Sequence, residues 1–122
     1  MKLSSTIFFI LMALFFASCD DAYDLNFIVN NTSEDTVHLY YNKRIDGDTT
    51  ILILPNERKT FLADYIVGPK ASRFDDCCPC RFDSIAINDS SIHITDPNKW
   101  AVEKDNGSKS HKVGYVNCIF TK

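Results

Sequence analysis

The sequence predicts an all-β domain, an antiparallel β-sandwich of about seven short strands, behind an N-terminal signal peptide. Three observations lead to this fold class. Short segments alternate apolar and polar side chains, which is the period of a half-buried strand. Clusters of Asn, Asp, Ser and Gly separate these segments, as turns do in sandwiches. Beyond the first 18 residues, no long window shows the 3.6-residue period of a helix.

Alternation is clearest in the first two predicted strands, over 24–30 and 36–42. The turn cluster between them, 30–35, consists only of Asn, Thr, Ser, Glu and Asp. One parity of each strand is entirely apolar, so these side chains are expected to face the core. The residues expected inside are Leu25, Phe27 and Val29 in the first strand, and Val37, Leu39 and Tyr41 in the second.

The later strands follow from β-branched or alternating runs that end at turn residues. They are expected over 49–54, 58–66, 82–88, 91–95 and 112–121, with a hairpin turn at 88–90. In the strand over 58–66, the inward residues are expected to be Thr60, Leu62 and Tyr65. Such a set of strands is typical of immunoglobulin-like or similar sandwiches of about 100 residues.

One segment before the last strand breaks the alternation. Residues 96–100 contain Pro97 and predict a short turn or 3₁₀ segment that leads into an edge strand. Trp100, the only tryptophan, is expected to lie in the core or over it as a lid.

Length and charge limit the classes of function. The 122 residues allow one ordinary domain. Lys and Arg number 13 against 16 Asp and Glu, so the formal net charge is −3. This balance supplies no field that would hold a polyanion, and nucleic acid is therefore not expected as a partner.

The N-terminus has the pattern of a secretory signal. After Lys2, residues 7–17 form an unbroken run of eleven apolar residues, which is too short for a helix that crosses a bilayer. Small residues, Ala17 and Ser18, close the run as they do before a cleavage point. The expected organisation is a signal peptide over 1–18, a tether over 19–24 and a β-sandwich domain over 25–122.

Phe16-Ala17-Ser18-Cys19 resembles the lipobox of bacterial lipoprotein signals, with Phe in place of the usual Leu. The resemblance implies that Cys19 is lipidated, that the signal is removed before it, and that the acyl chains anchor the protein to a membrane. Asp20-Asp21 resembles the acidic surface-export signals of Bacteroidota-type lipoproteins, although a solvated acidic tether explains it equally well. The alternative is an ordinary signal peptide, with Cys19 as a structural cysteine of the mature protein.

The chain as a whole is similar to small Bacteroidota-type lipoproteins with a β-sandwich domain. The residues that carry the likeness are Cys19-Asp20-Asp21, Asn30-Asn31-Thr32-Ser33, Ile53-Leu54-Pro55, Phe82-Asp83-Ser84-Ile85 and the Trp100 segment. The likeness implies a lipid-anchored protein of the cell envelope, at the outer membrane, on its periplasmic face or on the cell surface. It implies no particular chemistry.

Four cysteines lie beyond Cys19, and an exported chain meets an oxidising compartment, so disulfides are expected among them. The candidates are Cys77, Cys78, Cys80 and Cys118. Three complete pairings are possible, and the one that joins the neighbours Cys77 and Cys78 is disfavoured by geometry. We favour a bond from Cys118 to one of the other three, since Cys118 shares the apolar parity of Val116 and Phe120.

Other chemistry starts from Cys77-Cys78-Pro79-Cys80. Its C-x-x-C spacing occurs in thiol oxidoreductases, but a strand pattern rather than a helix follows. A thiolate metal site with His93 or His111 is the other option, although a second pair of ligands is lacking. No catalytic constellation and no cofactor motif stands out.

The function expected from the sequence is that of a non-enzymatic binding, accessory or structural module. Acylated Cys19 would attach it to a membrane, and an envelope protein is a possible partner. The segment 67–81 is expected to present the binding surface, since sandwich domains carry specificity in their loops. The alternative function is thiol redox chemistry or metal handling by the cluster from Cys77 to Cys80.

Overall fold

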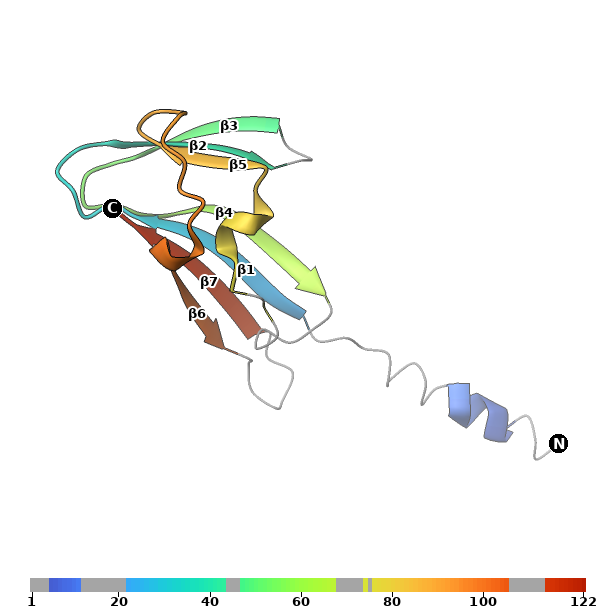
Figure 1. Cartoon of the computed structure of the whole chain (residues 1–122). Coiled ribbons are helices and arrows are strands. Elements are labelled where there is room, and N and C mark those ends of the chain that lie inside the picture. Colours follow the sequence, from blue (N-terminus) through green and yellow to red (C-terminus); the bar gives the residue numbers. More distant parts are fainter. Residues whose placement is uncertain (1–4, 12–21, 44–46, 68–73, 75, 106–113) are drawn as a thin grey trace.

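Two facing β-sheets make up the domain in the computed structural model, which describes residues 5–11, 22–43, 47–67, 74, 76–105 and 114–122 (Figure 1). A four-stranded sheet has the order β4-β1-β7-β6, and a three-stranded sheet has the order β3-β2-β5. The strands of the described residues are β1 (Ala22–Asn30), β2 (Val37–Lys43), β3 (Gly47–Ile53), β4 (Arg58–Val67), β5 (Ser84–Ile87), β6 (Trp100–Asp105) and β7 (Gly114–Thr121). A short helix covers 5–11, and none of the described helices is long and apolar enough to cross a membrane.

The central pair of the larger sheet runs parallel. β1 and β7 pair in parallel from Tyr23 opposite Gly114 to Asn30 opposite Thr121, while the other strand pairs are antiparallel. The prediction of a wholly antiparallel sandwich is therefore wrong in this sheet. The strand order also differs from that of an immunoglobulin constant domain, where the first strand lies at a sheet edge. Alternation reports which face of a strand is buried, but it carries no information on strand direction.

The core lies between the two sheets and is built on the predicted alternation. All six residues expected inside β1 and β2 are buried, and the prediction for these strands is confirmed. Four aromatic rings link the sheets: Phe27 of β1 contacts Phe82 at 4.8 Å between ring centroids, and Tyr41 of β2 contacts Phe61 of β4 at 5.3 Å. Aromatic contacts of this kind add to the stabilisation from burial alone.

β4 departs from the prediction because it contains a bulge. Phe27 pairs with Leu62 and its neighbour Ile28 pairs with Thr60, so Phe61 is the extra residue on β4. The bulge turns Phe61 into the core, where it is 8% exposed. Thr60 and Tyr65, both expected inside, are exposed instead, and only Leu62 packs against the core.

The chain turns after β5 as predicted, but the segment that follows the turn does not form a second strand. Residues 91–95 contribute one isolated bridge, between Ala86 and His93. The turn is fixed locally, because the Asp89 carboxylate accepts hydrogen bonds from the backbone N–H and the hydroxyl of Ser91. These two hydrogen bonds lower the pKa of Asp89. The chain then leaves the sheet edge toward Pro97.

The segment before β6 has the predicted form. A 3₁₀ turn, η3 (Pro97–Lys99), leads into β6, which is an edge strand. Trp100 is 5% exposed and belongs to the core. Its indole N–H donates to the carbonyl oxygen of Ile94 at 3.0 Å, so the buried polar end of the ring is paired.

Asn31 is the one buried polar or charged residue of the described part of the chain, and it joins two turns. Its Nδ2 group donates to the carbonyl oxygens of Asp35 (2.8 Å), Ile53 (3.3 Å) and Leu54 (3.0 Å). Its Oδ1 atom accepts from the backbone N–H and the hydroxyl of Ser33. The turn between β1 and β2 is thus bonded to the turn between β3 and β4, and each of these turns runs from one sheet to the other.

We expect Asn31→Ala to lower the free energy of unfolding by about 2–3 kcal/mol, because it removes the donor to one buried and two partly buried carbonyl groups. Urea denaturation of the full-length protein measures the change. Asn98→Ala is the matched control: Asn98 is exposed, and its loss should cost less than about 0.5 kcal/mol. Equal effects of the two substitutions would show that Asn31 does not hold the turns together.

Candidate functional site

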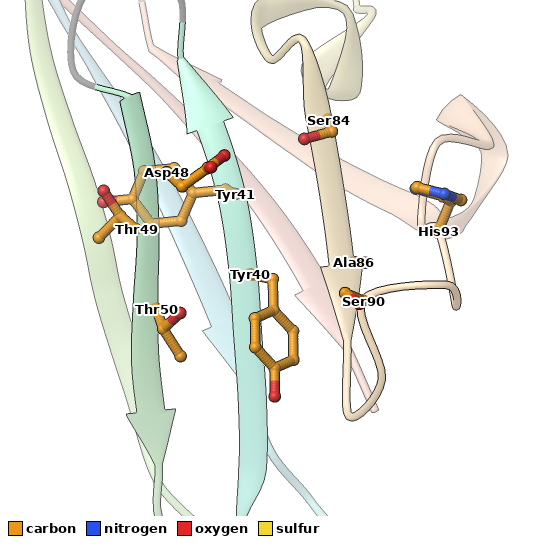
Figure 2. A pocket seen from close by; sticks show the side chains of 9 residues that line it. All are labelled: Tyr40, Tyr41, Asp48, Thr49, Thr50, Ser84, Ala86, Ser90 and His93. Atoms are coloured by element: carbon orange, nitrogen blue, oxygen red, sulfur yellow. The ribbon is translucent and has the colours of Figure 1, made fainter.

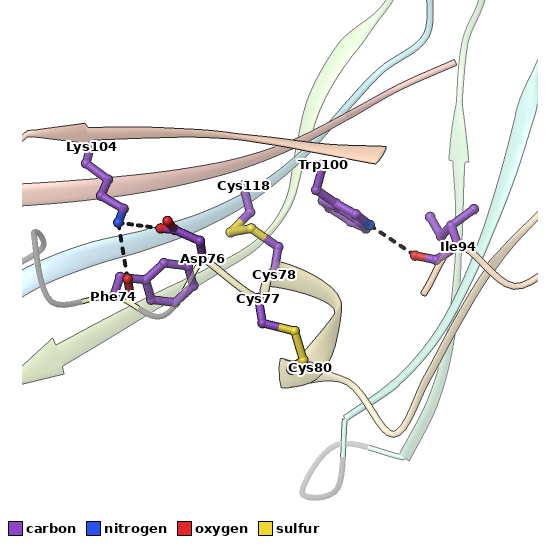
Figure 3. The surroundings of a disulfide bond; sticks show 9 residues. All are labelled: Phe74, Asp76, Cys77, Cys78, Cys80, Ile94, Trp100, Lys104 and Cys118. Carbon is purple, nitrogen blue, oxygen red and sulfur yellow. Dashed lines mark hydrogen bonds and ion pairs between the residues drawn. A yellow bond between two sulfur atoms is a disulfide. The ribbon is translucent and has the colours of Figure 1, made fainter. Parts of the chain in front are cut away.

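The structure brings the four candidate cysteines together at one place beside the larger sheet (Figure 3). Cys78 and Cys118 form a disulfide with a Cα–Cα distance of 5.8 Å across 40 positions of sequence. Both residues are fully buried. Cys118 points inward on β7 together with Val116 and Phe120, as its parity predicted. This bond joins a central strand to the turn η2 (Cys78–Arg81).

Cys77 and Cys80 form the second disulfide, with a Cα–Cα distance of 5.4 Å. Their surroundings differ from those of the first bond, since Cys80 is exposed and Cys77 is half-buried. η2 is a single 3₁₀ turn and leads directly to Phe82 and β5. The C-x-x-C segment therefore does not begin a long helix, which is the setting that lowers a thiol pKa in oxidoreductases.

The chain just before the cysteines is fastened to β6 through Phe74 and Lys104. The Lys104 ammonium group donates to the carbonyl oxygen of Phe74 at 3.1 Å and forms an ion pair with Asp76. Phe74 is buried, and the cations of Lys104 and Arg81 lie over its ring at 5.9 and 5.4 Å. Of the segment 67–81 that was expected to present a binding surface, residues 68–73 and 75 lie outside the described residues.

The cysteines are not arranged as a metal site. With both disulfides formed, none of the four sulfur atoms is a thiolate that could bind a metal. Within the described ranges, no group of three or more His, Cys, Asp and Glu residues could hold a metal ion. His111 and the predicted lipidation residue Cys19 lie outside the described residues. His93, the other histidine considered as a ligand, lies beside β5 at the edge of the smaller sheet, where it forms an isolated bridge with Ala86.

That smaller sheet carries a pocket on its outer face, which sequence reasoning missed. Tyr40 on β2 is opposite Thr50 on β3 and Ala86 on β5, and Ala86 is opposite His93. Residues directly opposite one another share a face, so these four form one row across the sheet. A cavity of about 290 Å³ lies over this row (Figure 2). Outward residues such as Tyr40 are visible in the alternation, but the register that aligns them is not.

A second row borders the same pocket. Asn42 on β2 is opposite Asp48 on β3 and Ser84 on β5. The Asn42 amide donates to the Asp48 carboxylate at 2.8 Å, which fixes the orientation of the carboxylate. Ser90, from the turn after β5, also lines the cavity. The pocket thus combines an aromatic ring, a carboxylate, an imidazole and several hydroxyl groups, the side-chain types that orient small polar ligands.

Comparisons with known proteins give no further guidance: the chain matches no protein-family model, no curated protein and no solved structure. The candidate site is therefore assigned from the chemistry of its own residues.

The two disulfides should differ in their contribution to stability. We expect the double variant Cys78→Ala/Cys118→Ala to lose about 4 kcal/mol of unfolding free energy, since this bond closes a loop of about 40 residues. The Cys77–Cys80 disulfide closes only a short loop. The matched double variant Cys77→Ala/Cys80→Ala should therefore lose about 2 kcal/mol of unfolding free energy. Urea denaturation under non-reducing conditions compares the two.

Alkylation of the denatured, non-reduced protein provides the check on pairing. Peptide mapping should find no labelled thiol at any of the four cysteines of the domain, Cys77, Cys78, Cys80 and Cys118. Labelling of all four cysteines in protein purified from an oxidising compartment would refute both bonds.

Proposed function

We propose that the protein is a lipid-anchored lipoprotein of the cell envelope, similar to Bacteroidota-type lipoproteins, whose β domain acts as a non-enzymatic binding module at the outer membrane. The lipobox from Phe16 to Cys19 supports the anchor. β1 begins at Ala22, only three residues after Cys19, so acyl chains on this cysteine would hold the domain close to the bilayer. Several acyl chains bind a membrane firmly, because each buried CH₂ contributes about 0.8 kcal/mol.

The observation that carries the binding role is the outer-face pocket of the three-stranded sheet. Its aromatic and hydroxyl side chains lie on adjacent strands whose register is fixed by the backbone. Rigid strands keep such groups in place better than loops do. The anchor is attached to β1, which belongs to the other sheet, and the tether and the pocket are therefore on different layers of the domain (Figure 1).

Replacement of Cys19 by alanine tests the anchor. We expect Cys19→Ala to move the protein from the membrane fraction to the soluble fraction of the cell envelope, because the acylated residue is lost. Intact mass of the unsubstituted protein should exceed that of the chain starting at Cys19 by the mass of the attached acyl groups. Its processing should also be sensitive to globomycin.

Ser18→Ala is the matched control for that experiment. It keeps a small residue before Cys19, so lipidation and membrane localisation should be unchanged. If Cys19→Ala remained in the membrane fraction in the same amount as Ser18→Ala, the anchor proposal would be wrong.

A second candidate function is thiol exchange in the envelope, and the exposure of Cys80 favours it. In this reaction a thiolate of an external dithiol attacks Sγ of Cys80, and Cys77 leaves as a thiolate that takes up a proton. The second thiol of the donor then resolves the mixed disulfide, so the donor is oxidised while Cys77 and Cys80 are reduced.

Graded reduction distinguishes this function from a purely structural one. With increasing dithiothreitol, we expect Cys77 and Cys80 to be alkylated first, because Cys78 and Cys118 are fully buried. Mass-spectrometric mapping after quenching gives the order. Simultaneous labelling of all four cysteines would mean that the exposed bond has no separate reactivity, and the redox alternative would then fail.

A further inference from the structure

We infer that the outer-face pocket binds a neutral sugar unit, with the sugar ring against the face of Tyr40. This inference rests on the proposed binding role and specifies its ligand class. Backbone pairing shapes the pocket, because it aligns four residues in one row across the sheet and the bridge at its edge: Thr50, Tyr40, Ala86 and His93. Figure 2 shows Tyr40 and Thr50 side by side on neighbouring strands, and His93 on the far side of Ala86.

Tyr40 provides the apolar surface that such a ligand needs. It lies on the middle strand of the sheet and is only half-buried, while Tyr41, next in sequence, points into the core. The flanking residue on β5 is Ala86, whose side chain is a single methyl group. Ala86 is itself buried, so the exposed part of the Tyr40 ring is the surface against which the C–H face of a pyranose ring can pack.

Hydroxyl groups around the ring match a polyhydroxylated ligand. Thr50, Ser84 and Ser90 line the cavity, and each hydroxyl both donates and accepts hydrogen bonds. A sugar hydroxyl also does both, so the two sets of groups are complementary. The carboxylate of Asp48, oriented by Asn42, accepts hydrogen bonds from hydroxyl donors more strongly than a neutral oxygen does.

Charge argues against the other small polar ligands. Among the described residues that line the pocket none is Lys or Arg, so a phosphate or a carboxylate would find no cationic partner there. An amine would be attracted to Asp48, but this carboxylate is exposed, so the attraction is largely screened by water and salt. The hydroxyl groups and the aromatic ring thus decide in favour of a neutral polyol.

Size sets the scale of the interaction. About 290 Å³ lies at the lower end of the range of about 300–1,000 Å³ that ligand pockets occupy. The pocket therefore accommodates one sugar unit rather than a stretch of polysaccharide. A contact of this size predicts weak binding, with a dissociation constant on the order of 1 mM.

The test uses the full-length protein in a detergent without a sugar headgroup. Saturation-transfer difference NMR and calorimetric titration are run with glucose, galactose, mannose and N-acetylglucosamine, and with methylammonium and inorganic phosphate as the charged probes. We expect at least one of the sugars to bind. Tyr40→Ala should weaken that binding by about tenfold, because the stacking surface is removed, whereas Tyr40→Phe should retain it within about threefold.

Two further variants complete the experiment. Asp48→Asn should weaken sugar binding several-fold. Tyr65→Ala is the matched control, because Tyr65 is an exposed tyrosine on β4 of the other sheet, and this variant should bind like the unsubstituted protein. Thermal melting of every variant confirms that the domain is folded.

The inference is overturned if none of the four sugars binds. It is also overturned if binding is unchanged in folded Tyr40→Ala, or if methylammonium or phosphate binds more tightly than every sugar with the same dependence on Tyr40. The membrane fractionation of Cys19→Ala does not involve the pocket. A failed anchor and a failed sugar site are therefore told apart by independent measurements.

Discussion

The buried disulfide between Cys78 and Cys118 is the covalent link on which the relation of the two sheets depends. Cys118 lies on β7 in the middle of the larger sheet, and Cys78 begins the turn that leads into β5 of the smaller sheet. Phe82, four residues after Cys78, packs against Phe27 of β1. The bond therefore places β5 over the core, and β5 in turn supplies one wall of the outer-face pocket. A domain of this size buries a limited core, so one such cross-link contributes a large part of its stability.

Polar groups make the corresponding connection between the turns after β1 and β3. The Asn31 side chain bonds these two turns, each of which runs from one sheet to the other. The C-terminal residue adds to this connection, since Lys122 donates to Asn30 and accepts from Thr32. Between the disulfide and this hydrogen-bonded set lie the aromatic contacts of the core. The disulfide and the Asn31 hydrogen bonds thus fix the two sheets relative to each other at two separate places. Between them lies the pairing of β2 with β3 and β5, which sets the spacing of Tyr40, Asp48 and Ser84.

Sequence reasoning succeeded where a single strand carries the information. Period-two alternation identified the buried faces of β1 and β2, and parity alone placed Cys118 inside. It failed where two strands must be compared. The parallel pairing of β1 with β7 and the bulge at Phe61 depend on register, which alternation does not encode. The pocket was missed for the same reason, because Tyr40, Asp48 and His93 lie on separate segments and become neighbours only through the register of strand pairing.

A weak sugar site would bind a polymer effectively if the protein that carries it were also anchored to a membrane. A dissociation constant on the order of 1 mM is ineffective for a single soluble protein that meets a single sugar. Many copies anchored in one membrane would meet a polysaccharide as an array, and each engaged copy would raise the effective concentration of the next unit at its neighbours. The pocket lies on the sheet that does not contain β1, the strand nearest the proposed anchor, and this placement would leave it open to such a polymer. Weak binding per site would then give firm but reversible attachment of the polymer to the membrane surface.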